Sequence, residues 1–590
     1  MSSNALVIVL AVIFFGLYYF VTVAQSEPSS WRLKSFFLGG ANIGPELTEH
    51  STLGITFAWS GGTWFFAWFG YQYGPIFIIY QMYWVISVIG IALLLPRIIR
   101  KIKNKTLHGF LGDHYGVKTQ GVAAIATTIG YVINMGFELF WSALLFTSCI
   151  GYSELALPIA CIMAITVGVY CSIGGYRSNA HTDKSQNILS VIGLGLVVFL
   201  VSTDINLPSN YMFAVNVFSG GCALYVLISV LHGFVNKKLP HWLLNFIPIV
   251  LVGISFYVSY VLLQESSSFA NVLSHNTFDN KGATLDFFIG GAPLVFFIGM
   301  ITFQLFFNMV DMQNWQQIAA NSEMEDNVIS DLQWSVIRGA LYLFWFPALG
   351  GILLGCALRF VSGNPGIGAN GEGIFTVAFQ HVIPNAMEFI RAGVIGIILL
   401  GFISSTLSTV DSLLMSKVQT IFYDLIWRGR ILKVISQNEE NINEEHSIVL
   451  GARIWIIPLS LLSVFVFYGM NTFYSGQVGY FQSLMYALPL SLFAPIIYAL
   501  FYPKNADKFI GKYVFAGILI SIVIVTFMFI IASLDGSVYD IKIYFPMFSS
   551  YNLKDWLPAL APIVSNIISC FVLLLAIIMK KIGYNKVCDP

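Results

Sequence analysis

Hydroxyl and carboxyl side chains are concentrated in one apolar stretch near residue 400. From Ser404 to Ser412, seven of nine positions carry a hydroxyl or an acid. Ser404, Ser408, Asp411 and Ser412 would share one helical face at i, i+4, i+7 and i+8 spacing. Such oxygens can replace much of the hydration shell of a sodium ion. The alternative is hydrogen bonding between helices or back to the same helix, but an acid in an apolar segment favours a functional site.

A second unusual stretch carries small and polar residues between positions 54 and 64. Gly54, Ser60, Gly61, Gly62 and Thr63 interrupt an otherwise apolar run. Glycine-rich interruptions of a membrane helix are typical of unwound backbone that lines a cavity, and the freed carbonyl oxygens can bind a hard cation. The other interpretation is that small residues only permit close helix packing. The residues alone leave both open.

Glu138 is an isolated acid inside a long apolar run. An intramembrane carboxylate is a functional candidate by default. It could bind a cationic group, bind a proton or pair with a neighbouring side chain. We therefore count Glu138 among the candidate solute-binding residues.

The elements that must position these residues are membrane helices. The 590 residues are 57% hydrophobic and 10% charged, with a mean hydropathy of +0.78. The apolar runs are about 20 residues long, which suits helices that cross a bilayer. We expect about fifteen spans, near residues 5–24, 51–70, 75–95, 121–150, 155–173, 186–203, 211–232, 242–263, 286–310, 335–361, 389–420, 449–471, 478–501, 512–534 and 557–580.

The distribution of Lys and Arg predicts the orientation of these spans. With the N-terminus outside, 24 of the 29 basic residues fall in cytoplasmic segments. The exceptions are Lys281, Arg359, Arg391, Lys542 and Lys554. An odd number of spans then places the C-terminus in the cytoplasm. The first run lacks a charged leader and a cleavage site, so it is expected to be a retained helix. We expect a multi-pass protein of the plasma or inner membrane.

Several function classes lack their signatures in this sequence. No GxxxxGK[ST] motif for nucleotide binding is present. The seven cysteines form no CxxC pair, and the nine histidines show no HExxH spacing. The protein is therefore not expected to be an enzyme, and an ion gradient or the solute gradient itself would supply the energy. We expect neither a nucleic acid partner nor an obligatory protein partner.

Four short segments, in order, resemble motifs of the solute:sodium symporter family. That family includes sodium-coupled sugar, proline, pantothenate and urea-type transporters. Residues 36–41 (FFLGGA) resemble its FFLAGR segment, and Gly174-Gly175-Tyr176 with residues 182–186 (TDKSQ) resembles its GG…TDxxQ segment. Residues 311–317 (DMQNWQQ) resemble DQxxxQR, and residues 404–414 resemble SSxxSTxDSxLL. Each motif is weak alone, but four in order across residues 30–500 are specific.

The resemblance implies an all-α, LeuT-like core of two inverted five-helix repeats within a single transporter domain, residues 1–590. Residues 51–203 would be the first repeat and 286–501 the second. Residues 204–285 have no clear family counterpart and would be an inserted helical hairpin. Residues 502–590 would be peripheral helices.

The resemblance also implies which residues bind the coupling ion, sodium, the only cofactor expected. The ligands would be two hydroxyls and three backbone carbonyls, from Ile55, Ala58, Gly401, Ser404 and Ser405. The register of the first two could slip by one, to Thr56 and Trp59. Asp183 matches an acid near the cytoplasmic sodium exit, although a surface-facing structural role is an alternative.

Departures from the family motifs leave the solute open. Ala41 replaces the Arg of FFLAGR and Gly39 its Ala, while Met312 and Gln317 replace the first Gln and the Arg of DQxxxQR. By position, the candidate solute ligands beside Glu138 are Gln81, Gln304, Gln482 and the aromatic Phe307.

Three functions remain open on these observations. The leading hypothesis is sodium-driven symport of a small polar organic solute by alternating access. The second keeps the fold but couples to protons through Glu138 or Asp411. The third is a transporter-like solute sensor, although the sequence carries no output domain.

Overall fold

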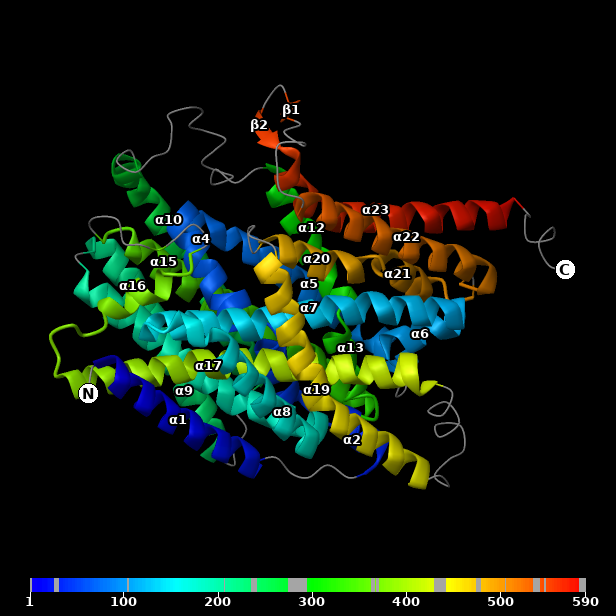
Figure 1. Ribbon diagram of the computed structural model, residues 1–590, viewed down its shortest axis with the longest axis horizontal. Helices are drawn as coiled ribbons and strands as arrows, with labels where there is room; N and C mark the ends of the chain where they lie inside the picture. The colour runs from blue at the N-terminus through cyan, green and yellow to red at the C-terminus, as the bar shows by residue number, and fades with distance from the viewer. Residues whose placement is uncertain are drawn as a thin grey trace.

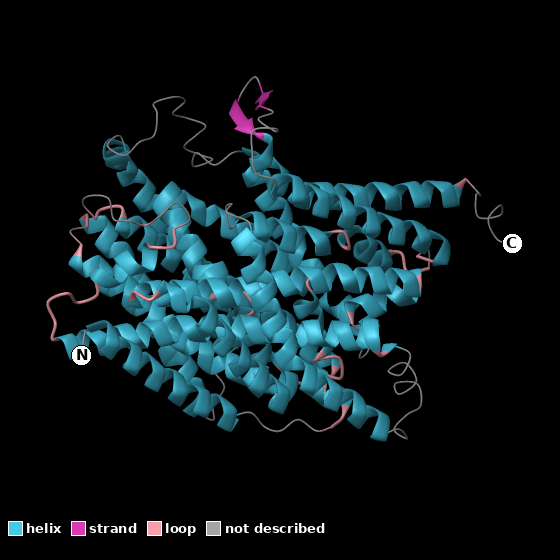
Figure 2. Cartoon of the chain, in the orientation of Figure 1, coloured by secondary structure: helices cyan, strands magenta, loops and turns pink. Residues whose placement is uncertain are grey.

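The computed structural model describes residues 3–25, 31–102, 106–205, 207–234, 241–273, 294–361, 367, 371–428, 442–473, 479–504, 506–533, 542–545 and 548–582. Almost all of this is helix (Figure 2). The exception is an antiparallel hairpin of β1 (Lys542–Phe545) and β2 (Phe548–Asn552), which stands at one edge of the bundle. The predicted all-helical body is therefore present, with a small β-ribbon added to it.

The helices of the N-terminal half include three short pieces with non-α geometry and one break near residue 56. They are α1 (Ser3–Gln25), α2 (Leu33–Leu38), α3 (Pro45–Gly54), η1 (Trp59–Trp64), α4 (Phe65–Tyr73), η2 (Pro75–Phe77), α5 (Ile78–Ile102), α6 (Leu107–Tyr115), α7 (Val117–Ile150), η3 (Ser153–Leu155), α8 (Ala156–Asp204), α9 (Ser209–Phe234) and α10 (His241–Leu273).

The C-terminal half begins at residue 294. Its helices are α12 (Leu294–Val310), α13 (Met312–Ala319), η4 (Asp326–Val328), α14 (Ile329–Leu343), η5 (Phe344–Gly350), α15 (Gly351–Leu358), α16 (Ile374–Gln380), α17 (Glu388–Thr420), η6 (Ile421–Ile426), α19 (Ile442–Phe473), α20 (Gly479–Leu490), α21 (Phe493–Phe501), α22 (Lys508–Ser533) and α23 (Leu553–Lys581).

Eleven helices of the described residues are long and apolar enough to cross a membrane. This makes the chain a multi-pass integral membrane protein, because so many apolar helices need lipid or one another to cover them. These eleven helices are fewer than the fifteen crossings expected, in part because two of the expected spans, near 155–173 and 186–203, are the two arms of the bent helix α8.

The helix α8 reverses direction at Gly175. That residue has φ 61° and ψ −157° inside the helix, a backbone region open only to glycine. Forty-nine residues of straight helix would reach about 73 Å. Instead, both ends of α8 lie beside one short segment: Cys149, just before α8, bonds Thr376, and Asp204 pairs with His381 at 2.7 Å. The two arms therefore run back alongside each other.

Two long helices, α7 and α17, form the centre of the molecule. They lie along its long axis in Figure 1, and the apolar windows of α7 and α17 are 83% and 78% buried within the protein. The windows of α22 and α23 are only 33% buried, and these two helices pack on each other at one edge. The polar stretch of residues 404–412 therefore lies on a helix that is largely enclosed by the bundle.

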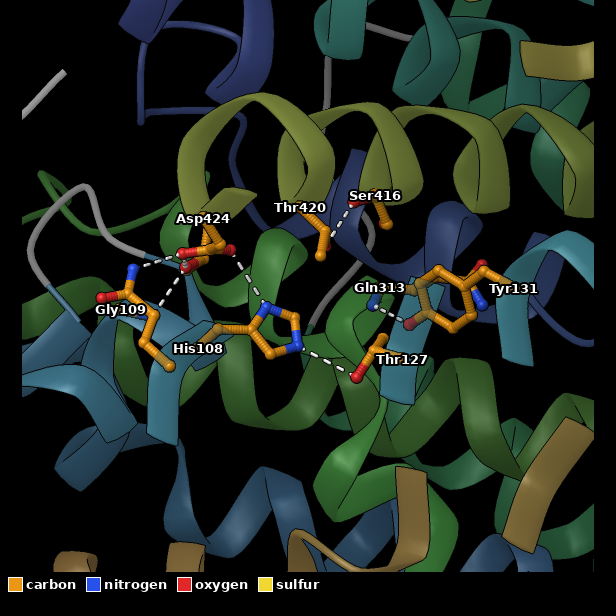
Figure 3. A network of polar contacts seen from close by, with 10 residues as sticks. His108, Gly109, Thr127, Tyr131, Gln313, Ser416, Thr420 and Asp424 are labelled. Carbon is orange, nitrogen blue, oxygen red and sulfur yellow. Dashed lines mark hydrogen bonds and ion pairs between the residues drawn. The ribbon is translucent and has the colours of Figure 1, made fainter. Parts of the chain in front are cut away.

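A buried polar cluster holds the end of α17 (Figure 3). The Asp424 carboxylate of η6 accepts hydrogen bonds from Thr106 Oγ1 at 2.8 Å, Gln120 Nε2 at 2.7 Å and His108 Nδ1 at 3.0 Å. His108 Nε2 lies 2.9 Å from Thr127 Oγ1. Every member is buried, so this cluster, which we call the α6 clamp, fixes α6 against α7 and η6.

Candidate ion and solute site

The helix that begins at Pro45 is broken between Gly54 and Trp59. Residues 55–58 are non-helical, and the chain resumes as the π-helical turn η1. A Cβ at Gly54 would lie 2.2 Å from Ser408 Oγ, so only glycine allows α17 to come this close. Thr409 Oγ1 donates to the Gly54 carbonyl at 2.7 Å. The glycine-rich stretch is therefore an unwound segment against α17, rather than only a packing surface.

The unwound segment faces the serine pair of α17. Gly54 touches Ser408 at one end. At the other end, Trp59 stacks on Phe402 with ring centroids 4.8 Å apart. These two contacts enclose residues 55–58 of the unwound segment on one side and residues 403–407 of α17 on the other. The fold thus places the segment that contains Ile55 and Ala58 against the part of α17 that contains Ser404 and Ser405.

The oxygens at this place differ in how well they are satisfied. Ser404 Oγ is fully buried and has no hydrogen-bond partner among the described residues. Ser405 Oγ donates to the Phe402 carbonyl at 2.7 Å, which leaves its lone pairs unused. The Ala58 carbonyl accepts from two backbone amides, of Gly62 and Thr63, both at 3.0 Å. An orphaned buried hydroxyl is costly unless something binds it, whereas the Ala58 carbonyl is already satisfied by two backbone donors.

Gly401 lies at a close helix crossing. A Cβ there would lie 2.5 Å from the carbonyl oxygen of Leu189 and 3.0 Å from the Cα of Gly193, both on α8. The residue type is therefore explained by packing, whatever its carbonyl binds.

Asp183 is fully buried, which excludes the surface-facing role considered for it. Its Oδ1 accepts a hydrogen bond from Ser408 Oγ at 2.5 Å, and Ser51 lies in hydrogen-bonding reach. Asp411, on the same stripe of α17, accepts instead from Tyr170 at 2.7 Å. The stripe therefore joins α17 to the second arm of α8 through Asp183 and to the first arm through Tyr170.

A cavity of about 50 Å³ opens beside η1. Two of the three predicted glutamines, Gln81 and Gln304, line it, and none of the described side chains that line it is charged. Its lining comprises Thr56, Gly61, Gly62, Phe65, Phe66, Tyr80, Gln81, Trp84, Phe303, Gln304, Pro347 and Tyr486. Gln304 Oε1 has no hydrogen-bond partner in the described part of the chain. The lining suits a small solute with polar edges and flat faces.

The other solute candidates lie outside this lining. Phe307 is one layer behind, stacked on Trp84 with centroids 5.9 Å apart and edge-on to Tyr486 at 4.7 Å. Gln482 belongs to helix α20, but its side chain is outside the part of the structure that is described. Glu138 is buried against Ser60 and Gly61, and Gly61 itself lines the cavity.

Three residues in or near the site could not be singled out from the sequence. Ser142 on α7 bonds Ser60 at 3.1 Å and Thr406 at 2.8 Å, yet a lone serine in a helix forms no pattern. Lys417 is a fully buried cation on α17 whose bonded partners are all neutral. Tyr486 lines the cavity although its surroundings in the sequence are ordinary apolar helix.

Comparisons with known proteins agree with this architecture. No family model matches the chain. A Drosophila melanogaster protein described as a sodium-dependent multivitamin transporter is 24% identical over 119 residues, which is 20% of this chain and 19% of that protein. The solved structure of a Na+-coupled sialic acid symporter, substrate-bound and outward-open, superposes with a TM-score of 0.63 at 13% identity and covers 97% of both chains.

The two matches differ in what they establish. The structural match shows the fold over nearly the whole chain, and the sequence match covers one fifth of it. Both matched proteins are sodium-dependent transporters rather than enzymes. In its fold and in this short stretch of sequence, the chain resembles the sodium/solute symporters.

Proposed function

We propose that the protein is a secondary active transporter that couples inward sodium movement to uptake of a small polar organic solute. The observation that carries the proposal is Ser404 Oγ, a fully buried hydroxyl without a partner among the described residues, on the helix that packs against an unwound segment. Folding leaves such an atom unpaired at a cost, and a bound sodium ion would remove that cost.

Sodium would bind between the unwound segment and α17. The carbonyls of Ile55, Ala58 and Gly401 and the hydroxyls of Ser404 and Ser405 would be its ligands. Because α3 and α17 belong to different parts of the bundle, an ion held by both favours the arrangement in which they touch. Asp183, bonded to Ser408 one turn below Ser404, would receive the ion on its way to the cytoplasm.

The solute would bind in the cavity beside η1, and Gln81 and Gln304 would hydrogen-bond it. The absence of charged lining residues favours an uncharged solute. Phe307 would support the aromatic wall from behind, and Gln482 would lie near it. Since Gly61 and Gly62 line the cavity and continue from the sodium segment, sodium binding and solute binding would share one piece of backbone. That shared segment is the physical basis for coupling.

The proposed topology has fifteen crossings with the N-terminus outside and the C-terminus in the cytoplasm. Residues 51–203 and 286–501 would be the inverted repeats that rock for alternating access, 204–285 an inserted hairpin and 502–590 a peripheral pair. Counting α8 as two crossings raises the eleven long helices to twelve. The proposed number adds α1, the broken helix formed by α3, η1 and α4, and α12. An odd count also agrees with Figure 1, where α1 begins at one end of the long axis and α23 ends at the other.

The test begins with sodium itself, because the solute is unidentified. Radioactive sodium binding to the purified protein should weaken at least about tenfold in Ser404→Ala and in Ser405→Ala. Ser255→Ala is the matched control, since Ser255 is equally buried but bonds only the carbonyl of Leu251 on its own helix. Equal sodium binding by all four proteins would reject this site.

The solute is then sought by thermal shift. Amino acids, sugars, urea and carboxylates are screened with and without sodium, and uptake of any stabilising compound is measured in proteoliposomes. We expect uptake only with an inward sodium gradient. Uptake that needs no sodium would contradict the coupling, and binding without any uptake would favour a sensor.

A further inference from the structure

A continuous row of hydrogen bonds joins Glu138 on α7 to the serine helix α17. Ser60 Oγ donates to the Glu138 carboxylate, and the Gly61 amide donates to the same oxygen at 3.3 Å. Ser142 Oγ donates to Ser60 Oγ at 3.1 Å and lies 2.8 Å from Thr406 Oγ1. We call the three hydroxyls of Ser60, Ser142 and Thr406 the hydroxyl row.

The direction of every bond in the hydroxyl row is fixed by the charge of Glu138. A hydroxyl has one proton to donate, and a carboxylate can only accept. With Glu138 ionised, Ser60 must donate to it and Ser142 must donate to Ser60. The proton between Ser142 and Thr406 then has to come from Thr406. All donors point towards the acid.

Protonation of Glu138 would reverse this row. The acid would become a donor to Ser60, Ser60 to Ser142, and Ser142 to Thr406. Thr406 would then turn its proton to the only other acceptor in its reach in the described structure, the Phe402 carbonyl at 3.3 Å. That carbonyl already accepts from Ser405 Oγ at 2.7 Å. The protonation state of Glu138 would therefore alter the hydrogen bonding of a proposed sodium ligand.

No ion pair neutralises the charge of Glu138 in the described structure. Its described hydrogen bonds are all from uncharged groups, on η1. The elements packed against α7 carry several titratable groups. They are Tyr486 of α20, Lys417 of α17, which reaches Met135 one turn away on α7, Asp411 of α17, bonded to Tyr170, Asp183 of α8, bonded to Ser408, and His108 of α6 with Asp424 of η6; Asp311 is bonded to Tyr131, two turns away on α7. None of these groups is hydrogen-bonded to the Glu138 carboxylate in the described structure.

We propose that Glu138 is a proton-binding site and that the hydroxyl row transmits its protonation to the sodium site at Ser405. A proton fits here without movement, because Ser60 already touches the carboxylate, whereas a sodium ion between them would have to separate the two side chains. The solute cannot replace the proton in this role, because Glu138 does not line the cavity. The proposal rests on the sodium site proposed above.

The sign of the effect follows from the row. At low pH, Thr406 competes with Ser405 for the Phe402 carbonyl, and the negative charge near the sodium site is lost. Both changes weaken sodium binding. By thermodynamic reciprocity, bound sodium lowers the proton affinity of Glu138.

The experiment measures radioactive sodium binding to the purified protein as pH is varied. We expect the dissociation constant for sodium to rise about fivefold or more from high to low pH in the wild type. Glu138→Gln should remove this dependence. Ser142→Ala keeps the acid but interrupts the row, so it should remove the part of this dependence that the row transmits and leave only the part that acts through space. Ser142→Thr should restore the wild-type dependence.

Thr147→Val is the matched control. Thr147 is a fully buried hydroxyl on the same helix that bonds only carbonyls of α7, so this variant should keep the wild-type pH dependence. Full pH dependence in Ser142→Ala would overturn transmission through the hydroxyl row and indicate a through-space effect. Full pH dependence in Glu138→Gln would overturn the proton site.

A second measurement separates this proposal from the sodium site itself. Infrared spectra of the protein without sodium should show the carbonyl band of a protonated carboxylic acid on acidification, and Glu138→Gln should lack that band. If sodium does not bind at all, the proposed function fails while this band still tests the proton site. If sodium binds at every pH alike, only the further inference fails.

Discussion

At the scale of single residues, the site is built from groups that would be unfavourable elsewhere in a membrane protein. Ser404 is buried without a partner among the described residues, and Gly61 is so close to Glu138 that a Cβ would lie 2.3 Å from the carboxylate. Each of these features can be tested with a small substitution, because the expected effect depends on one contact.

Gly61→Ala should damage the site without unfolding the protein. The added methyl group displaces the Glu138 carboxylate, and overpacking of this kind costs about 1–3 kcal/mol. We expect a lower melting temperature in detergent and weaker sodium binding. Gly121→Ala on α7, where a Cβ meets nothing within 4 Å, should be neutral. Equal behaviour of the two variants would argue against the close contact.

Lys417 is a residue whose charge should be dispensable. Its ammonium group bonds Ser463 Oγ at 2.6 Å, the Leu459 carbonyl at 3.0 Å and Met135 Sδ at 3.1 Å, and a buried cation with only neutral partners is costly. Lys417→Met keeps most of the volume, so the melting temperature should stay the same or rise. Lys417→Ala leaves a cavity and should lower it. A large loss of stability in Lys417→Met would show that the charge itself is needed.

At the scale of elements, α8 and the α6 clamp control how the central helices are held. The reversal of α8 depends on Gly175, where a Cβ would also lie 2.5 Å from the carbonyl oxygen of Phe36. Gly175→Ala should therefore destabilise the fold by about 1–3 kcal/mol from backbone strain, with the clash in addition. The measurement is the melting temperature, compared again with Gly121→Ala; a neutral Gly175→Ala would be inconsistent with the reversal.

The α6 clamp should loosen when its acid is neutralised. Asp424→Asn keeps the size of the side chain but leaves the donors of Thr106, Gln120 and His108 with one carbonyl oxygen between them. Breaking a buried charged network costs about 3–5 kcal/mol. Hydrogen exchange of residues 107–115 should speed up, while exchange in α23, which packs mainly on α22, α20 and α12, should not. Unchanged exchange in residues 107–115 would mean that the apolar face of α6 alone holds it.

At the scale of the whole molecule, the topology makes one direct prediction. With fifteen crossings, a reporter fused to the N-terminus should be active outside the cell, and a fluorescent protein fused to the C-terminus should fold in the cytoplasm. The charge distribution and the opposite ends of α1 and α23 in Figure 1 both support this. Reporters on the same side would require an even number of crossings.

The sequence by itself determined the features that depend on local composition. Apolar runs of bilayer length fixed the helical class, and the glycine-rich break at 54–62 and the hydroxyl stripe at 404–412 marked the two segments that meet. These signals are readable because a membrane penalises every polar residue, so each exception stands out.

Only the tertiary structure decided how these segments combine. Ser142 and Thr406 bond across 264 residues of sequence, and Ser60 and Glu138 across 78. Nothing in the sequence around Ser142 distinguishes it from a packing residue. The sequence predicted separate spans at 155–173 and 186–203, but only the structure shows that the turn between them is made by Gly175 alone. The physical reason is that the sequence gives the position of each hydroxyl along the chain, whereas its hydrogen-bond partner depends on which helices pack together.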